Sequence, residues 1–342
     1  MVRRPSNDTS SRPVSMADVA RAAGVSQQTV SRVANGLPNV NEQTRQRVQA
    51  AMQELGFRPS YAGRSLRDGR YHSVGLCVND VTKFGNLSMI DGIASAAREH
   101  NCAITLVEMS KTEEFSLAEA TRRMAALPVD GIIIGMSRMA PDFETFDPLP
   151  GIGTVIVTMY AHPRVTTVDS DHYGCSLLLM DHLFELGHEQ IRYIGGPSFS
   201  VDEQFRRAGW QDALERKHIE PAEPLEGDWS ANSGYEAGRY LAEHDRTMTA
   251  IYAANDQMAN GAIAALRDSG LRVPEDVSVV GVDDSLGDIV PDRRLTTVRF
   301  DNKRVGMWAV DKIAGAEGVE PGVEHMLFPG VLVEGDTVRD LR

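Results

Sequence analysis

The chain has 342 residues, a formal net charge of −13 and 42% hydrophobic residues. This length suggests two or three domains, and no run of about 18 apolar residues is present that could cross a membrane. The start, MVRRPSNDTSSRPVS, lacks the apolar segment of a secretory signal, and we expect residues 1–14 to be a disordered tail. Cys77, Cys102 and Cys175 have no CxxC spacing and indicate small buried side chains in a reducing, cytoplasmic compartment.

The charge is divided unevenly along the sequence. Residues 1–70 contain eleven Arg, no Lys and five acidic residues, which gives a net charge of +6 and leaves −19 for the remainder. A basic segment on an acidic body is typical of a nucleic-acid-binding head joined to a domain that avoids polyanions.

Residues 15–59 have the pattern of a helix-turn-helix followed by a third helix. Ser15 and Ser26 can each cap a short helix, and Gly24 separates the two. Asn41 can cap the third. Apolar residues in each segment recur at helical spacing, so the three helices can share one small core.

The second predicted helix, residues 27–35, has the composition of a DNA-reading element. Val30 and Val33 face inward, which leaves Gln27, Gln28 and Arg32 outside. The N-terminal part of this helix meets base edges in the major groove, where Gln pairs with adenine and Arg with guanine. A small helical bundle with solvated polar residues is the alternative, but the positive charge favours DNA. We predict DNA contacts from Gln27, Gln28, Thr29, Ser31, Arg32 and Asn35.

This head resembles that of the LacI (lactose repressor) family of bacterial transcription regulators. The resemblance is carried by VSMADVARAAGVSQQTVSRVANGLPNVNEQTRQRVQAAMQELGFRP and continues in order through YAGRSLRDGR, VGL, DGIII, ELGH, IGGP, ANDQMANGA, LRVPEDVSVVGVDD and LTTVR. It covers nearly the whole chain after residue 14. It implies a homodimeric repressor that binds double-stranded operator DNA and a small effector, without catalytic residues, cofactor or metal.

Residues 60–71 are the predicted hinge between head and body. The resemblance implies a helix that forms here only on operator DNA, with Leu66 wedged into the minor groove. Gly63 stands where the family commonly has Ala, and glycine inside a helix costs about 0.5–1 kcal/mol. We therefore expect the hinge helix to order less readily. A flexible Arg-rich linker is the alternative for the free protein.

From residue 72 onward, short apolar runs alternate with amphipathic stretches, which predicts an α/β body. We predict strands at 74–78, 103–107, 131–135, 152–157, 191–195, 250–253 and 277–282, and helices at 89–100, 113–126, 172–186, 201–217, 233–243 and 256–269. The body, 72–342, is long for a single sheet. We expect two Rossmann-like subdomains with parallel sheets, and the resemblance implies the same periplasmic-binding-protein-like core.

The family's core crosses between its two lobes three times. We place these crossings near residues 159–170, 284–299 and 322–328. The first lobe is then about 72–160 and 300–325, and the second about 170–283 and 329–338.

The nine mostly polar residues after the last strand are too few for the leucine-rich tetramer helix of the lactose repressor, so we expect a dimer.

Polar and aromatic side chains follow several of the predicted strands, where parallel sheets bind ligands. Arg offers a planar fork to vicinal hydroxyls, carboxylates accept from hydroxyls, and Trp offers a flat apolar face to a sugar ring. Together with the resemblance, this predicts a sugar-like effector bound by Asp169, Arg206, Trp229, Asn255, Gln257 and Asp283.

Each of these residues also has a plainer interpretation. Asn255 or Asp256 could be a helix N-cap, Asp283 a loop acid and Trp229 a core residue. A further alternative is a regulator of the same fold whose ligand, a purine or a sugar phosphate, acts as a corepressor. Lys83 could meet such an anion, although an exposed loop lysine is the simpler account.

Other classes of protein have little support in the sequence. His182 and His188 are six residues apart, which does not fit the i, i+4 spacing of a zinc-binding helix. There is no GxGxxG, Walker A or Gly-x-Ser-x-Gly motif, so nothing indicates an enzyme. A pure solute-binding protein would lack the basic head.

Overall fold

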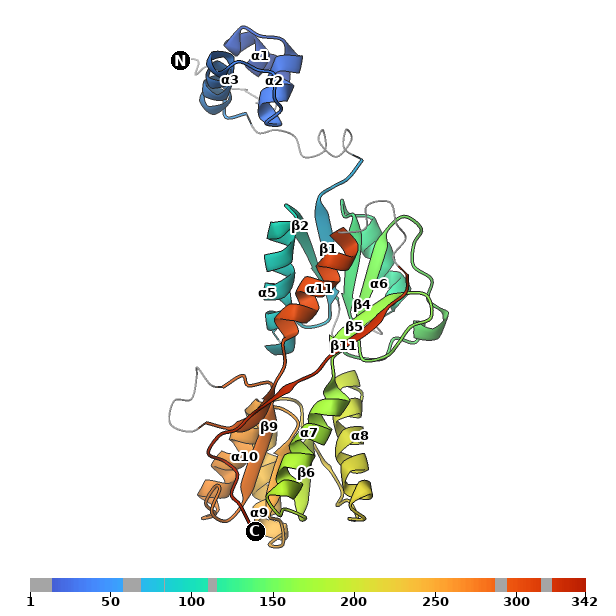
Figure 1. The fold of residues 1–342 in the computed structure, drawn as a ribbon, viewed down its shortest axis with the longest axis vertical. Coiled ribbons are helices and arrows are strands. Elements are labelled where there is room, and N and C mark those ends of the chain that lie inside the picture. The colour runs from blue at the N-terminus through green and yellow to red at the C-terminus, as the bar shows by residue number, and fades with distance from the viewer. Residues whose placement is uncertain (1–13, 58–68, 83, 110–115, 287–293, 315–321) are drawn as a thin grey trace, which may run out of the picture. The chain divides into compact units, whose positions relative to one another are not determined.

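A computed structural model describes residues 14–57, 69–82, 84–109, 116–286, 294–314 and 322–342 (Figure 1). The chain divides into two compact units, a head at residues 1–71 and a body at residues 72–342. Most of the expected tail and hinge, including Gly63 and Leu66, lies outside the described residues.

The head is a bundle of the three predicted helices, α1 (Met16–Ala23), α2 (Gln27–Ala34) and α3 (Glu42–Leu55). The Ser15 hydroxyl accepts from the amide of Asp18, whose carboxylate accepts from the amide of Ser15 at 3.0 Å. This reciprocal capping box stabilises the start of α1. Val19, Val30 and Val48, one from each helix, are fully buried and form the centre of the core.

The first lobe of the body is built on a six-stranded parallel sheet with the order β11-β5-β4-β3-β1-β2. Its strands are β1 (Ser73–Val78), β2 (Ala103–Glu108), β3 (Gly131–Gly135), β4 (Gly153–Val157), β5 (Thr166–Ser170) and β11 (His325–Phe328). Its helices are α5 (Phe84–Glu99), α6 (Leu117–Ala125), the short 3₁₀ helix η1 (Phe143–Thr145) and α11 (Asn302–Ala314).

The central strands β1 and β3 are buried on both faces and are almost entirely apolar. Leu76 and Ile133 point toward α5 and α11, whereas Cys77 and Ile134 point toward α6. Successive side chains on a strand face opposite sides of the sheet, so such continuous apolar strands need a helix layer on each side. Burial raises the pKa of the Cys77 thiol to about 11, which leaves it unreactive.

Helices α5 and α11 approach closely at two glycines. A Cβ atom at Gly92 would lie 1.9 Å from the carbonyl oxygen of Lys303, and one at Gly306 would lie 2.1 Å from that of Met89. Only glycine fits at both points. These contacts join two helices that are about 200 residues apart in the sequence.

The second lobe has a six-stranded sheet with the order β12-β10-β9-β8-β6-β7, parallel except for the edge strand β12. Its strands are β6 (Ile191–Gly195), β7 (Leu225–Glu226), β8 (Ala250–Ala253), β9 (Ser278–Val282), β10 (Thr296–Arg299) and β12 (Val331–Val333). Its helices are α7 (His172–Glu185), α8 (Val201–Arg216), α9 (Ala231–His244) and α10 (Asp256–Asp268). The core includes Tyr193 stacked on Trp210 with ring centres 5.0 Å apart.

The chain passes between the lobes three times, at residue 171, at 300–301 and at 329–330 (Figure 1). The three crossings predicted near 159–170, 284–299 and 322–328 were therefore placed too early, as were the ends of the lobe segments at 160, 283 and 325. In each case the chain completes one more strand before it leaves: β5 and β11 pair with each other in the first sheet, and β10 pairs with β9 in the second.

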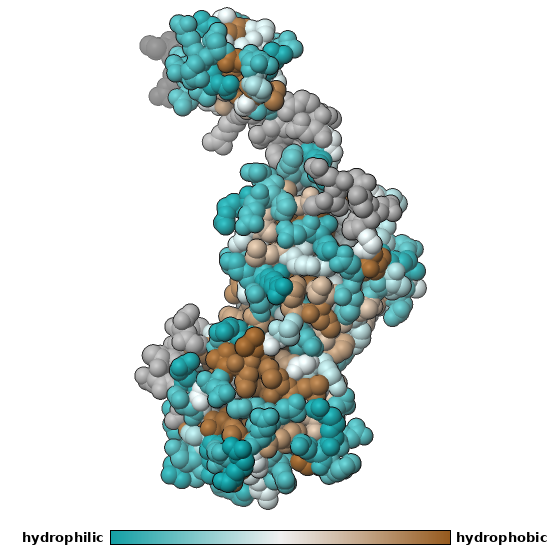
Figure 2. Space-filling view, in the orientation of Figure 1, coloured by the Kyte–Doolittle hydropathy of each residue, from teal (hydrophilic) through white to brown (hydrophobic). Residues whose placement is uncertain are grey.

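The prediction also missed α11 and began α5 five residues late, because both helices carry mixed rather than clearly amphipathic patterns. In the described part of the chain, no helix is long and apolar enough to cross a membrane. Figure 2 shows mostly hydrophilic side chains on the face in view, together with a hydrophobic patch on the second lobe.

Candidate functional site

Helix α2 of the head exposes the side chains predicted to read DNA. Gln27, Gln28 and Arg32 are exposed, while Val30 and Val33 are buried beneath them. The helix thus turns the amides of Gln27 and Gln28 outward at its N-terminal end and the guanidinium of Arg32 outward in its last turn. The exposed groups at the N-terminal end are placed as a recognition helix requires to reach base edges.

The three smaller predicted contacts are half-buried and also hold the ends of α2 in place. The hydroxyl of Thr29 lies 2.9 Å from that of Ser26, the N-cap. The Asn35 amide donates to the carbonyl of Ser31 at 2.5 Å. Leu66, the seventh predicted contact, lies outside the described residues.

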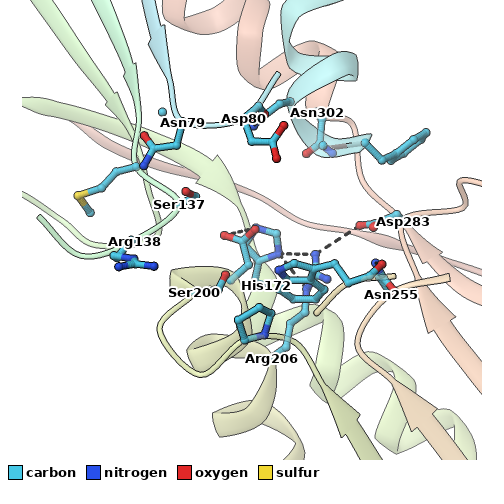
Figure 3. Close-up of a pocket in the computed structure, with 18 of the residues that line it drawn as sticks. Asn79, Asp80, Ser137, Arg138, His172, Ser200, Arg206, Asn255, Asp283 and Asn302 are labelled. Carbon is cyan, nitrogen blue, oxygen red and sulfur yellow. Dashed lines mark hydrogen bonds and ion pairs between the residues drawn. The ribbon is translucent and has the colours of Figure 1, made fainter. Parts of the chain in front are cut away.

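A cavity of about 740 Å³ is lined by both lobes of the body (Figure 3). Its walls are formed mainly by the segments that follow the carboxyl ends of strands, as expected for parallel sheets. All six predicted effector residues line it: Asp169, Arg206, Trp229, Asn255, Gln257 and Asp283. The structure brings them together, and their contact with an effector remains a prediction.

Arg206 on α8 is almost fully buried and connects three parts of the cavity wall. Its Nη2 lies 3.3 Å from Oδ1 of Asp283, its Nε donates to Nδ1 of His172 at 3.3 Å, and its Nη1 donates to the carbonyl of Ala254. Burial raises the pKa of Asp283, while the positive charge of Arg206 opposes this shift. The guanidinium is therefore held in one orientation.

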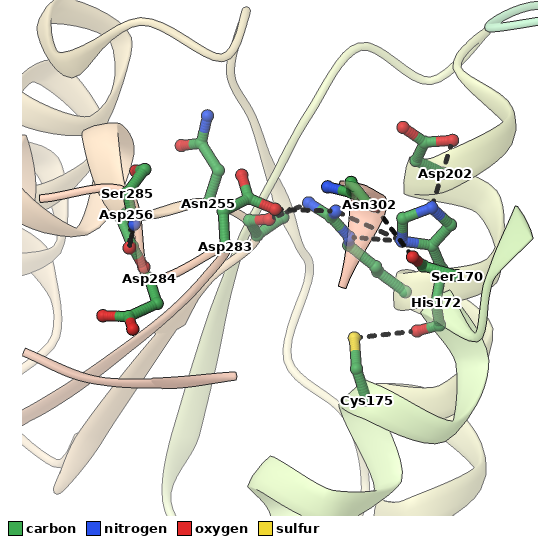
Figure 4. A network of polar contacts seen from close by, with 12 residues as sticks. Ser170, His172, Cys175, Asp202, Asn255, Asp256, Asp283, Asp284, Ser285 and Asn302 are labelled. Atoms are coloured by element: carbon green, nitrogen blue, oxygen red, sulfur yellow. Dashed lines mark hydrogen bonds and ion pairs between the residues drawn. The ribbon is translucent and has the colours of Figure 1, made fainter. Parts of the chain in front are cut away.

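His172, the first residue of α7, lies between Arg206 and the carboxylates of Asp169 and Asp202. Figure 4 shows its ring facing Asp202. Because the arginine donates to Nδ1, the ring proton is assigned to Nε2. Nε2 lies 3.7 Å from Oδ1 of Asp169 and 3.6 Å from Oδ1 of Asp202, longer than ordinary hydrogen bonds. Burial raises the pKa of Asp169; His172 opposes this shift, and the nearby charge of Asp202 adds to it.

Trp229 lines the cavity in an unusual backbone conformation, with φ of 74°. Its ring lies against Gly196, where a Cβ atom would come within 2.2 Å of the indole. The guanidinium carbon of Arg206 lies 5.5 Å from the ring centre. A strained conformation held in place at a cavity wall is typical of a binding site.

Comparison with known proteins decides the family. Residues 15–60 match the bacterial regulatory proteins of the lacI family, and residues 180–338 match the periplasmic binding protein-like domain. The Lactose operon repressor of Escherichia coli (strain K12) is 31% identical over 327 residues, which cover 95% of this chain and 91% of that protein. The HTH-type transcriptional repressor PurR of Haemophilus influenzae (strain PittEE) is 31% identical, covering 86% of this chain and 88% of that protein.

The chain belongs to the lacI family of bacterial regulatory proteins. Its fold agrees with a crystal structure of the lac repressor dimer bound to operator and the anti-inducer ONPF, with a TM-score of 0.83 and 30% identity. The match covers 96% of this chain and all of that one. The expected family and fold class, a helix-turn-helix head with a two-lobed α/β body, are confirmed.

In this LacI-family regulator, Asn255 has both of the roles considered for it. Its carbonyl accepts from the amide of Met258 at 2.8 Å and so caps α10, while its amide donates to the carbonyl of Trp229 at 3.0 Å. Gln257 donates to the hydroxyl of Ser285 at 3.1 Å and lines the cavity. The cap thus fixes the position of both side chains.

Asp256, between these two residues, is buried and faces away from the cavity. It accepts from the hydroxyl of Thr297 and from the amide of Ser285, both at 2.7 Å. Burial raises its pKa to about 8, with a further contribution from the charge of Asp283. Its role is to fix the turn after β9.

The prediction missed several residues of the cavity, above all in the first lobe. Ser137 and Arg138 follow β3, and the guanidinium carbon of Arg138 lies 3.8 Å from the ring centre of Phe199 in the second lobe. The carbonyl of Ser137 accepts from the amide of Val201 at 3.0 Å. The strand-end rule that found Asp169 and Asp283 could have found the residues after β1 and β3. The missed lining residues include Asn79, Asp80, Ser137, Arg138, His172, Phe199, Asp202 and Asn302.

Among the described residues, one set of side chains is close enough together to hold a metal ion, namely Asp169, His172 and Asp202. A metal would need a free electron pair on Nε2 of His172. The donation from Arg206 to Nδ1 leaves the proton on Nε2, so this arrangement suits a hydrogen-bonding ligand better than a metal.

Proposed function

We propose that this chain is a cytoplasmic, homodimeric repressor that releases its operator when a small sugar-like effector occupies the cavity between the lobes. The observation that carries the proposal is that one chain contains both an exposed helix suited to DNA reading and a cavity of ligand size. One is helix α2 with exposed Gln27, Gln28 and Arg32; the other is a cavity with Arg206 fixed in its wall. Both similar proteins reported above are named as repressors.

The chemistry of the cavity supports a polyhydroxylated effector. Arg206 offers a fixed fork of donors, Asp169 and Asp283 offer acceptors, and Trp229 offers an apolar face. Hydroxyl groups both donate and accept, so a sugar can satisfy acidic and basic groups at once. An aromatic ring beside these polar groups suits the apolar face of a pyranose.

The proposed dimer places two heads on a pseudo-palindromic operator, because two-fold symmetry in the protein requires the same symmetry in the two half-sites. The hydrophobic patch on the second lobe provides apolar surface that a partner subunit can cover (Figure 2). Footprinting of a selected operator tests this arrangement. One asymmetric half-site protected by a monomer would contradict it.

The proposed switch runs through the segment that joins head and body. Effector binding closes the cavity, changes the contacts of the first lobe with its partner, and disfavours the hinge helices that contain Leu66. Leu66→Ala is therefore expected to weaken operator binding while sparing effector binding. Equal operator affinity of the variant and the wild type would show that Leu66 does not contribute to operator binding.

The experiment that tests the function is a thermal-shift screen of the full-length protein against sugars, sugar phosphates and purines, followed by operator binding with each hit. Ligands that bind the folded state raise the melting temperature. We expect a sugar-like hit that weakens operator binding. A hit that tightens operator binding would show that the effector is a corepressor and not an inducer. The absence of a hit in all three classes of compound would contradict the proposed site.

A further inference from the structure

The charges around the cavity are strongly unbalanced. Among the described residues, six carboxylates line it and only two guanidinium groups. Both guanidiniums already have partners, since Arg206 is paired with Asp283 and Arg138 lies over the ring of Phe199. The carboxylates belong to Asp80, Asp169, Asp202, Glu226, Asp228 and Asp283. Such a wall repels phosphate groups and attracts cations.

Two of these carboxylates come from different lobes and lie beside the same buried imidazole. Asp169 is in β5 of the first lobe and Asp202 is in the first turn of α8 in the second. The Asp169 and Asp202 oxygens and Nε2 of His172 lie within 4.8 Å of one another. The His172 side chain is only 7% exposed, and within the described residues its Nε2 is 3.6 Å or more from both acids.

The hydrogen-bonding capacity and charge of these three side chains indicate which ligand groups would fit them. The Nε2 proton of His172 needs an acceptor. The Asp169 carboxylate accepts from the amide of Ser170 at 2.8 Å and can take further donors, while Asp202, whose side chain is 38% exposed, places a second negative charge beside it. A positive charge between the two carboxylates would compensate both. A single hydroxyl supplies an acceptor and one donor but leaves both negative charges uncompensated. A hydroxyl next to a protonated amine supplies everything: its oxygen accepts from His172, and the ammonium has three protons to donate to Asp169 and Asp202.

We propose that Asp169, His172 and Asp202 form a subsite for a protonated amine adjacent to a hydroxyl, so that the effector of this regulator is an amino sugar. This inference rests on the proposed function, because it assumes that the cavity is the effector site. The ammonium would connect the two lobes, since its two carboxylate partners belong to different ones.

Calorimetric titration of the full-length protein with four monosaccharides and three disaccharides tests the inference. The probes are glucosamine, glucose, N-acetylglucosamine and glucose 6-phosphate, together with the β-1,4-linked disaccharides of the first three sugars. We expect the amine to bind about tenfold or more tightly than its hydroxyl and N-acetyl counterparts, because charge-assisted hydrogen bonds are stronger than neutral ones. The phosphate should bind most weakly. Raising the pH until the amine is neutral should remove the preference.

Asp202→Asn keeps the shape of the side chain and removes one charge of the pair, so it should abolish most of the preference for the amine. Glu215→Gln is the matched control: it removes one charge from the same helix, α8, at an exposed position that does not line the cavity. Equal affinity for amine and hydroxyl probes, an unchanged preference in Asp202→Asn, or no binding by any probe would overturn the inference.

Operator binding separates this failure from failure of the proposed function. If neutral sugars bind and release the operator as well as amino sugars do, the amine subsite is wrong and the repressor function stands. If amino sugars bind with the expected preference but leave operator affinity unchanged, the subsite stands and the proposed switch is wrong.

Discussion

Arg206 shows how one residue can hold several parts of the second lobe's cavity wall together. It is 4% exposed, and its three donor contacts reach Asp283 at the end of β9, Ala254 after β8 and His172 at the crossing between lobes. Each partner lies on a different part of the wall. The side chain therefore sets the relative positions of the groups that face a ligand.

Substitution of Arg206 should separate effector binding from DNA binding. Arg206→Lys keeps the positive charge near Asp283 but loses the planar fork, so we expect effector affinity to fall about tenfold or more. Arg206→Ala leaves a buried carboxylate unpaired and should also destabilise the body by about 3–5 kcal/mol. Calorimetry and operator gel shifts measure the two activities. Wild-type effector affinity in Arg206→Lys would exclude Arg206 from the site.

Asp256 should give the stability of the body a characteristic pH dependence. Its pKa is about 8 in the folded protein and 3.8 as an ordinary carboxyl, so between these values the unfolded chain has lost a proton that the folded protein keeps. The free energy of unfolding should therefore fall as pH rises from about 4 to about 8. Asp256→Asn should flatten this slope in urea unfolding followed by tryptophan fluorescence. An identical slope in the variant would show that Asp256 does not titrate in this way.

At the residue scale, the sequence allowed six of the 28 described residues that line the cavity to be predicted. Asp283 was found because it directly follows β9, a strand that the sequence displays clearly. Asp169 was found from the short run Thr166–Val168 before it and from the family resemblance, although its strand, β5, was not predicted. His172 and Asp202 were missed because they lie in the first turns of helices. Only the crossing at residue 171 and the approach of α8 bring them to the cavity, and neither depends on a local pattern.

Among the elements, helix α2 should determine which bases are read. Gln27 and Gln28 are exposed at its start and Val30 anchors it to the core. Exchange of both glutamines for other base-reading residues should change the preferred operator, at about 1–3 kcal/mol for each bidentate contact, with little change in non-specific affinity. Selection of binding sites from a random pool measures the preference. An unchanged consensus would show that α2 is not the recognition helix.

The packing of α5 on α11 should be sensitive to a single methyl group. Gly306→Ala would place a Cβ atom 2.1 Å from the carbonyl oxygen of Met89, so the helices must move apart. We expect a loss of about 1–3 kcal/mol in the free energy of unfolding. Gly153→Ala is the control, because its Cβ would have no neighbour closer than 3.9 Å. Equal stability of the two variants in urea would contradict the close contact.

The elements that were hardest to predict are those whose identity depends on the other half of the chain. Strands β10 and β11 are four residues each, and β11 contains a histidine and an unremarkable apolar run. They exist because β9 and β5 each present an open edge to them. Their partner residues are 16 and 158 positions away in the sequence and cannot be identified from local periodicity, which explains why the lobe boundaries were placed one strand too early.

At the scale of the whole molecule, the division of charge agrees with the division of structure. The head, rich in arginine, and the acidic body are separate compact units. The alternation of strands and helices predicted the α/β fold of the body. Helix N-caps and the helical spacing of apolar residues predicted the three helices of the head, and the order of the sequence motifs predicted the family. The sequence predicted the general class of effector, a sugar-like molecule. A narrower identity depends on the exact placement of side chains from both lobes, which no local pattern reveals.

The central claim is that effector and operator compete through one conformational equilibrium. The most direct measurement is the affinity of the full-length protein for the best ligand of the screen, with and without saturating operator, together with operator affinity with and without that ligand. We expect effector and operator each to weaken the binding of the other by the same factor, about 5- to 150-fold. No change in either affinity, or a mutual strengthening, would contradict it.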